Sequence, residues 1–310
     1  MVVLDAGARP LQLRFLPDGR LLVGLRSETG ECAVEVWTLP AGGRVRVPIP
    51  DRRSWYLSNQ LAVSPTGDRF HLACGSLFTF ATADGAVARG PANPLPDPGD
   101  PAAAAHGGLP ADQVIAAPTG SLLVLYQMQP EDPWWRAAFA PDGTPVWHGG
   151  GDAWTYLAGF LSGGEEYLEV VAKRVVRRRS ADGAEVAAAR YPANRINQPQ
   201  VSPDGRHLGV IGYSAMYVYD TAVLAAPRAI KGSANFGNFV GFAFHPAGRT
   251  LAVIHGTTTL VKLYDLDTLT LRTKLNWKVG PLTCVAFSAD GLLGAAGTDD
   301  GRVVVWDVDE

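Results

Sequence analysis

The sequence LTCVAFSADG, residues 282–291, continues directly into LLGAAGTDDGRVVVWD, residues 292–307, and together they decide the fold. Three short apolar runs are separated by two glycine-containing turns, Ser288 to Gly291 and Asp299 to Gly301. Apolar runs of this length between such turns are typical of antiparallel strands joined by hairpins. We therefore predict strands over Thr283 to Phe287, Leu292 to Ala296 and Arg302 to Trp306.

The first of these turns recurs along the chain, each time between two apolar runs. Every copy ends in glycine, which adopts a positive φ without steric cost, and most contain proline or aspartate, which favour turns. The seven glycines lie 41 to 53 residues apart, and one four-stranded propeller blade takes about 40 to 50 residues. The copies are residues 16–19 (LPDG), 64–67 (SPTG), 117–120 (APTG), 161–164 (LSGG), 202–205 (SPDG), 245–248 (HPAG) and 288–291 (SADG).

The last unit resembles a WD repeat, because it ends in the dipeptide Trp306 and Asp307. Residues 208–220 and 251–265 are similar repeats with tyrosine in place of tryptophan, and the equivalents in the first two units are Val34 to Trp37 and Phe78 to Phe80. The resemblance to the WD-repeat β-propeller family covers nearly the whole chain and is most specific in its first and last thirds.

Period and resemblance together predict an all-β fold, a seven-bladed β-propeller of four-stranded antiparallel blades, with residues 1–310 as a single domain. An open propeller would leave its end blades with exposed faces and unpaired edges. The last unit ends just after its third strand, whereas Val2 to Leu4 is an apolar run ahead of the first unit. We expect Val2 to Leu4 to close the ring as the outermost strand of the last blade, the usual closure in the family.

The resemblance also implies a structural role for three residues of the last unit. Blades of the family often contain a buried polar tetrad of His, Ser or Thr, Asp and Trp. Thr298, Asp300 and Trp306 match three of these positions, whereas Lys278 stands where the histidine would be.

Composition narrows the classes of partner. The formal charge is −3 with a pI near 6.1, so we expect no nucleic-acid partner and no membrane partner. Cys32, Cys74 and Cys284 are too few and too scattered for a disulfide framework or a zinc site, and buried reduced thiols are expected. We expect a cytoplasmic monomer, and the usage of Gly, Ala and Pro suggests a bacterial source.

Loops that share one propeller face are rich in aromatic and basic residues. Trp, Tyr and Arg most often dominate binding energy, because they bury a large area and keep a polar handle. We therefore predict that this face binds a protein or peptide partner; the alternative is that these aromatic residues fill gaps between blades. The predicted partner-binding residues are Arg53, Trp55, Tyr56, Trp134, Trp135, Trp154, Tyr156, Arg195, Phe236, Trp277 and Lys278.

No catalytic residues, metal ligands or cofactor are predicted. The six histidines are scattered singly, and no glycine-rich phosphate loop occurs. We predict a non-enzymatic protein-interaction scaffold or recognition module. The alternative function is a hydrolase or lyase at the channel mouth, of the lactonase-like propeller type, which would need a metal or an acidic cluster.

Two further segments stand out. Pro91 to Pro110 is rich in Pro, Ala and Gly and is predicted to be a long loop. The alternative is that this loop acts as a lid. Lys173 and Arg174 with Arg177 to Arg179 form a basic cluster on the expected third strand of the fourth unit. Alternation would place these side chains on both faces of the sheet, so a solvated or acid-paired strand is favoured over a site for an acidic or nucleic-acid ligand.

Overall fold

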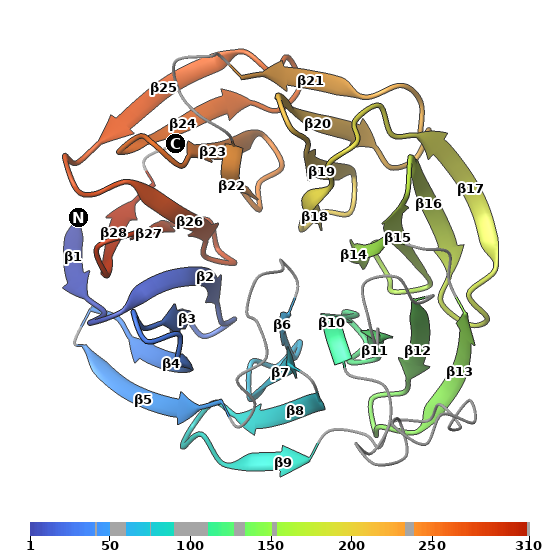
Figure 1. Ribbon diagram of the computed structural model, residues 1–310, viewed down its shortest axis with the longest axis horizontal. Helices are drawn as coiled ribbons and strands as arrows, with labels where there is room; N and C mark the ends of the chain where they lie inside the picture. The colour runs from blue at the N-terminus through green and yellow to red at the C-terminus, as the bar shows by residue number, and fades with distance from the viewer. Residues whose placement is uncertain are drawn as a thin grey trace. The chain divides into compact units, whose positions relative to one another are not determined.

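Strands account for all the regular secondary structure that the computed structural model describes. It describes residues 1–40, 42–49, 60–74, 76–89, 111–126, 134–150, 154–232 and 239–308. The strands form four-stranded antiparallel sheets in the orders β1-β28-β27-β26, β2-β3-β4-β5, β6-β7-β8-β9, β10-β11-β12-β13, β14-β15-β16-β17, β18-β19-β20-β21 and β22-β23-β24-β25. Within each sheet except the first, strand order follows the sequence (Figure 1).

The chain contains two compact units, of which unit 1 comprises Met1–Arg52, Ser202–Tyr219 and Pro227–Glu310. The apolar faces of neighbouring sheets pack together there. One core joins Leu13 and Val23 to Cys284 and Val303, and others join the successive sheets between β19 and β28. The strands of unit 1 are β1 (Val2–Asp5), β2 (Arg9–Phe15), β3 (Leu21–Arg26), β4 (Cys32–Thr38), β5 (Gly43–Pro48), β19 (His207–Ile211), β20 (Ala215–Asp220, whose last residue belongs to unit 2), β21 (Arg228–Lys231), β22 (Phe239–Phe244), β23 (Thr250–His255), β24 (Leu260–Asp265), β25 (Leu271–Asn276), β26 (Leu282–Phe287), β27 (Leu293–Thr298) and β28 (Arg302–Asp307).

Unit 2 comprises Arg53–Val201 and Asp220–Ala226. One core packs Ala73 and Leu77 against Val114 and Val124, and another packs Leu123 and the ring of Tyr167 together across the next pair of sheets. Its strands are β6 (Leu61–Val63), β7 (Arg69–Cys74), β8 (Ser76–Ala81), β9 (Val87–Arg89), β10 (Ala111–Ala116), β11 (Leu122–Tyr126), β12 (Trp135–Phe139), β13 (Pro145–Gly150), β14 (Thr155–Phe160), β15 (Glu166–Val171), β16 (Arg174–Arg179), β17 (Glu185–Arg190) and β18 (Asn197–Val201).

All seven recurring turns adopt the geometry that their sequence predicts. Each connects the first and second strands of a sheet, except that in the sheet closed by β1 the turn connects β26 and β27. Each terminal glycine has a φ between 71° and 90°, and its N–H donates to the carbonyl oxygen three residues earlier at 2.8 to 3.0 Å. The positive φ explains why glycine ends every copy of the turn.

The predicted closure is confirmed. β1 pairs with β28 in antiparallel register, with Val3 opposite Val304 and Leu4 opposite Val303. Figure 1 shows the amino-terminal strand beside the carboxy-terminal strands of the same sheet. The fold is therefore an all-β seven-bladed propeller whose ring is closed by its first strand, as the sequence predicts.

Individual strands differ slightly from the prediction in the sheet that contains β26, β27 and β28. The second strand begins at Leu293 rather than Leu292 and extends to Thr298. Leu292 is largely exposed, because the turn ending at Gly291 delays the start of pairing by one residue. Among the described residues, no helix is long and apolar enough to cross a membrane.

Candidate functional site

The structure describes seven of the eleven predicted partner-binding residues. Trp134, Trp135, Trp154, Tyr156 and Arg195 belong to unit 2, and Trp277 and Lys278 belong to unit 1. Arg53, Trp55, Tyr56 and Phe236 lie outside the described residues, as does the predicted loop from Pro91 to Pro110.

The two adjacent tryptophans pack on opposite faces of their sheet. Trp134 is 3% exposed and belongs to the core with Ile115 and Leu157, whereas Trp135 packs against the core that contains Val114. Neighbouring side chains of an extended chain point to opposite faces, which explains the split. These two side chains therefore fill space between sheets, as in the alternative interpretation of the loop aromatics.

Trp154, Tyr156 and Arg195 are more exposed to solvent than Trp134. Trp154 is 54% exposed, Tyr156 is half-buried and Arg195 is exposed. The ring of Tyr156 lies 6.4 Å from that of Trp134, centroid to centroid. The hydroxyl of Tyr191, which is fully buried, donates to the carbonyl oxygen of Arg195 at 2.6 Å and so fixes that loop.

A carboxylate that the sequence pattern did not indicate lies beside Tyr156 and Arg195. Asp112 is the extra residue of a β-bulge between β10 and β11. Its Oδ2 atom is buried and has no hydrogen-bond partner among the residues that the structure describes. Burial raises the pKa of Asp112 from 3.8 to about 6, and the side chain of Gln113 partly opposes this.

The electrostatics of Tyr156 place these groups near one another. Burial raises the pKa of its phenol, the carboxylate of Asp112 raises it further, and the guanidinium of Arg195 opposes both effects. We define the Tyr156 cluster as Asp112, Trp134, Trp154, Tyr156 and Arg195. It combines an aromatic surface with one partly buried negative charge and one exposed positive charge.

Backbone strain occurs at two predicted binding residues. Trp154 has a φ of 58° and Lys278 a φ of 55°, in the left-handed region that costs side-chain-bearing residues about 1 kcal/mol or more. At Lys278 the strained turn is held by its own N–H, which donates to Asn276 Oδ1 at 3.0 Å. Strain of this kind persists only where the surrounding structure imposes it.

The three residues predicted to have a structural role, Thr298, Asp300 and Trp306, form two separate sets of contacts. Thr298 Oγ1 donates to the carboxylate of Asp300, which also pairs with the guanidinium of Arg302. Trp306 instead packs against Trp277, with ring centroids 4.7 Å apart. Lys278, at the position of the family histidine, is exposed.

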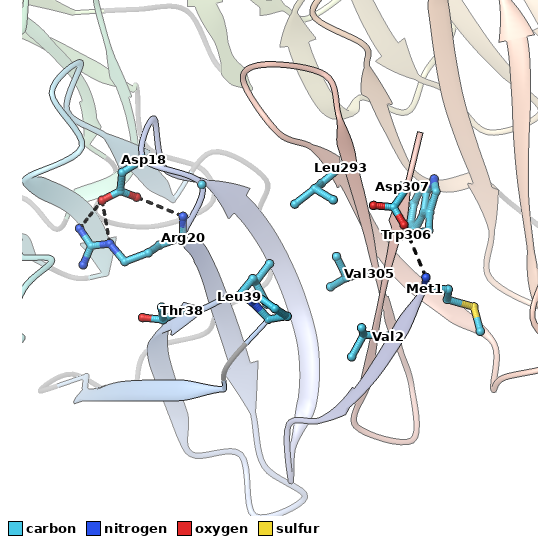
Figure 2. A pocket seen from close by; sticks show the side chains of 12 residues that line it. Met1, Val2, Asp18, Arg20, Thr38, Leu39, Leu293, Val305, Trp306 and Asp307 are labelled. Carbon is cyan, nitrogen blue, oxygen red and sulfur yellow. Dashed lines mark hydrogen bonds and ion pairs between the residues drawn. The ribbon is translucent and has the colours of Figure 1, made fainter. Parts of the chain in front are cut away.

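A cavity of about 400 Å³ in unit 1 lies beside the closing strand. Figure 2 shows Val2, Leu39, Val305 and Leu293 around it, from β1, the β4–β5 turn, β28 and β27. Its charged groups are already paired: Asp18 with Arg20 at 2.8 Å, and Asp307 with the amino group of Met1 at 3.6 Å. The cavity therefore offers an apolar wall and little uncompensated charge.

The described residues contain no group of three or more His, Cys, Asp or Glu arranged to hold a metal ion. The three cysteines form no disulfide, and Cys74 and Cys284 are buried, whereas Cys32 is partly exposed. Burial raises the pKa of Cys284 to about 11, so this thiol stays protonated at neutral pH.

Comparisons with known proteins agree with this architecture. Residues 270–307 match the family described as WD domain, G-beta repeat. The structure is similar to the β-propeller domain of Cps50 (Swd1) from Myceliophteria thermophila, with a TM-score of 0.75 and 14% sequence identity over 100% of this chain and 99% of that chain. A search of curated protein sequences gives no match. Residues 270–307 thus match one WD repeat, and the chain as a whole has the β-propeller fold.

Proposed function

We propose that the chain is a non-enzymatic recognition module, a single β-propeller domain that binds a protein or peptide through the Tyr156 cluster. WD-repeat propellers typically serve as protein-interaction scaffolds, and the fold supports that class of function. One observation supports this choice of site: the partly buried carboxylate of Asp112 has an oxygen atom without a hydrogen-bond partner. This carboxylate lies beside Tyr156 and the exposed Arg195.

A buried carboxylate oxygen without a hydrogen-bond partner, such as Oδ2 of Asp112, opposes folding. Native proteins satisfy the great majority of buried polar groups, so an exception is a candidate for function. A partner that brings an N–H donor or a cation to Asp112 would restore the missing interaction. The ring of Tyr156 and the exposed indole of Trp154 would contact the apolar part of the same side chain.

Among the residues that the structure describes, the partner-binding set that we propose differs from the one predicted from the sequence. Trp134 supports the Tyr156 ring from within the core, and we assign binding to Asp112, Trp154, Tyr156 and Arg195. We assign no contact to Trp135, because it packs into a different core. In unit 1, Lys278 is exposed and Trp277 is half-buried, and both remain proposed contacts.

A peptide selection on the immobilised protein tests this proposal. Selected peptides should bind Trp154→Asn and Arg195→Gln at least about tenfold more weakly than the unmodified chain, the loss expected when one strong contact is removed. Tyr213→Ala is the matched control, because Tyr213 is 67% exposed and lies in the β19–β20 turn. Equal binding to all four proteins would contradict the assignment, as would a selection that enriches no peptide.

The alternative enzymatic function makes a separate prediction. A hydrolase or lyase of the lactonase-like type would hold a divalent ion, so metal analysis of the purified protein distinguishes the two. We expect no stoichiometric metal; one ion per chain would favour the enzyme.

A further inference from the structure

A second feature of unit 2 shares no residue with the Tyr156 cluster. A cavity of about 260 Å³ is bounded by β12, β13, β16 and the β16–β17 turn. Two arginines line it, Arg136 from β12 and Arg178 from β16. Trp147 lies at its wall, where the indole N–H donates to the carbonyl oxygen of Ser180 at 2.5 Å. The cavity is therefore a polar space between two packed sheets.

Both arginines contact one buried carboxylate. Glu169, on β15, is fully buried. Its Oε1 atom lies 2.5 Å from Arg178 Nε and 3.4 Å from Arg136 Nη1. This carboxylate raises the pKa of Arg178 against the effect of burial, so Arg178 stays charged. Two positive charges and one negative charge thus meet at the inner side of the cavity.

The remaining acidic group at the cavity does not balance the excess charge. Asp182, in the β16–β17 turn, is half-exposed and already paired: its Oδ2 accepts from Arg179 at 2.7 Å and its Oδ1 from the N–H of Ala184 at 3.0 Å. Arg136 and Arg178 therefore retain one uncompensated positive charge toward the cavity.

Hydrogen bonding points to the same conclusion. Arg136 is 5% exposed, and its Nε donor is buried without a partner in the described part of the chain. A guanidinium presents its donors in a planar fork that matches the oxygen atoms of a carboxylate or phosphate. An unmet donor on a buried cation next to a polar cavity is the arrangement that an oxyanion completes.

We propose that this cavity binds an oxyanion, a phosphate or carboxylate group, through the guanidinium groups of Arg136 and Arg178. The group belongs either to a small molecule or to a side chain of another protein, because both present the same oxygen atoms. The basic strand β16 is thus acid-paired, as its sequence predicts, and Arg178 serves a ligand as well.

The cavity can be blocked without removing either arginine. Gly149 lines it, and a Cβ atom added there would meet no atom within 4 Å. Gly149→Leu should therefore fill the space while the fold is retained. Arg178→Gln removes one of the two charges. Arg174→Gln is the matched control, since Arg174 lies on the same strand, is exposed and pairs with Glu185 at 2.5 Å outside the cavity.

Calorimetric titration with inorganic phosphate at low salt tests the proposal. The unmodified chain and Arg174→Gln should bind alike, Arg178→Gln about tenfold more weakly, and Gly149→Leu not measurably. A parallel titration with a phosphoserine peptide identifies the source, because tighter binding of the peptide than of phosphate indicates a protein ligand. Absence of phosphate binding to the unmodified chain, or equal binding to Gly149→Leu, would overturn the proposal. If Arg178→Gln does not fold, Gly149→Leu decides alone.

Discussion

Trp134 and Trp154 lie on neighbouring loops of unit 2 and have opposite surroundings. Trp134 is buried between two sheets, whereas the indole of Trp154 is mostly in solvent on a strained backbone. Trp134→Ala should lower the free energy of unfolding by about 3 kcal/mol, because it leaves a cavity in the core. Trp154→Asn should change it by less than about 1 kcal/mol, because asparagine tolerates the positive φ. Urea unfolding of both variants checks the contrast, and a large loss in Trp154→Asn would show that this residue is structural.

His71 gives the fold a sensitivity to acid. It is buried, its Nδ1 lies 2.9 Å from Thr79 Oγ1, and burial lowers its pKa from 6.5 to about 4. The unfolded chain therefore binds the proton more readily, so this contribution to stability is complete above pH 6.5 and is lost as the pH falls toward 4. Relative to the unmodified chain, His71→Gln should gain about 2 kcal/mol in unfolding free energy between pH 7 and pH 5. Parallel pH dependences of the two proteins would exclude His71 as the cause.

Asp112 should behave in the opposite way. Its folded pKa of about 6 lies above the ordinary 3.8, so the folded chain binds the proton more readily. The residue therefore destabilises the fold increasingly as the pH rises through this range, and fully above pH 6. Asp112→Asn should raise the unfolding free energy at pH 7 by about 2 kcal/mol, with the advantage vanishing near pH 4. The same variant should bind selected peptides more weakly. A variant that is no more stable at pH 7, or that binds unchanged, would remove Asp112 from the proposed site.

At this scale the sequence revealed some residues and concealed others. The turn glycines were predictable because positive φ selects glycine at each position. The opposite placement of Trp134 and Trp135 follows from strand alternation and could have been anticipated. Asp112 carried one signal, a charged residue in the otherwise apolar and neutral start of an inner strand. The sharing of Glu169 by Arg136 and Arg178 could not be predicted, because it depends on which side chains of three strands meet.

Among the elements, β1 has the clearest energetic role. It supplies the fourth strand of a sheet whose other strands come from the opposite end of the sequence, and Leu4 packs against the core between that sheet and the next. Deleting Met1 to Leu4 should lower the unfolding midpoint by about 5 °C or more, since a loss of 2 to 3 kcal/mol has roughly this effect in a large domain.

Val2→Thr is the control for this deletion, because Val2 is 42% exposed and threonine preserves the strand. Its midpoint should stay close to that of the unmodified chain. A deletion variant that melts at the same temperature as the Val2→Thr protein would show that pairing of β1 with β28 contributes little.

The pairing of the basic strand β16 with acidic residues was among the arrangements predicted from the sequence. Its arginines alternate between faces and each meets an acidic group: Arg174 with Glu185, Arg177 with Glu166, Arg178 with Glu169 and Arg179 with Asp182. Strand alternation predicted a solvated or acid-paired strand rather than a ligand site. Burial distinguishes the pairs, and only the structure shows that Arg178 and Glu169 are mostly removed from solvent.

For the whole molecule, the turn period predicted the propeller, because it reflects local chemistry repeated along the chain. The closing strand was predicted from the strand missing in the last unit and from the usual closure of the family it resembles, since β1 pairs with the opposite end of the sequence. Function depends on which exposed side chains the loops bring close together in the folded chain, and the local sequence does not determine this arrangement. The proposed function therefore depends on whether the surface around Trp154 and Tyr156 contacts a partner.

A photo-crosslinking amino acid tests for this contact most directly. Trp154 can be replaced by p-benzoylphenylalanine, which preserves an exposed aromatic side chain, and the same replacement at Tyr213 provides the comparison. After irradiation in the native cell, we predict a discrete protein adduct from position 154 and none from position 213. No adduct at position 154, or the same adducts at both positions, would contradict the account.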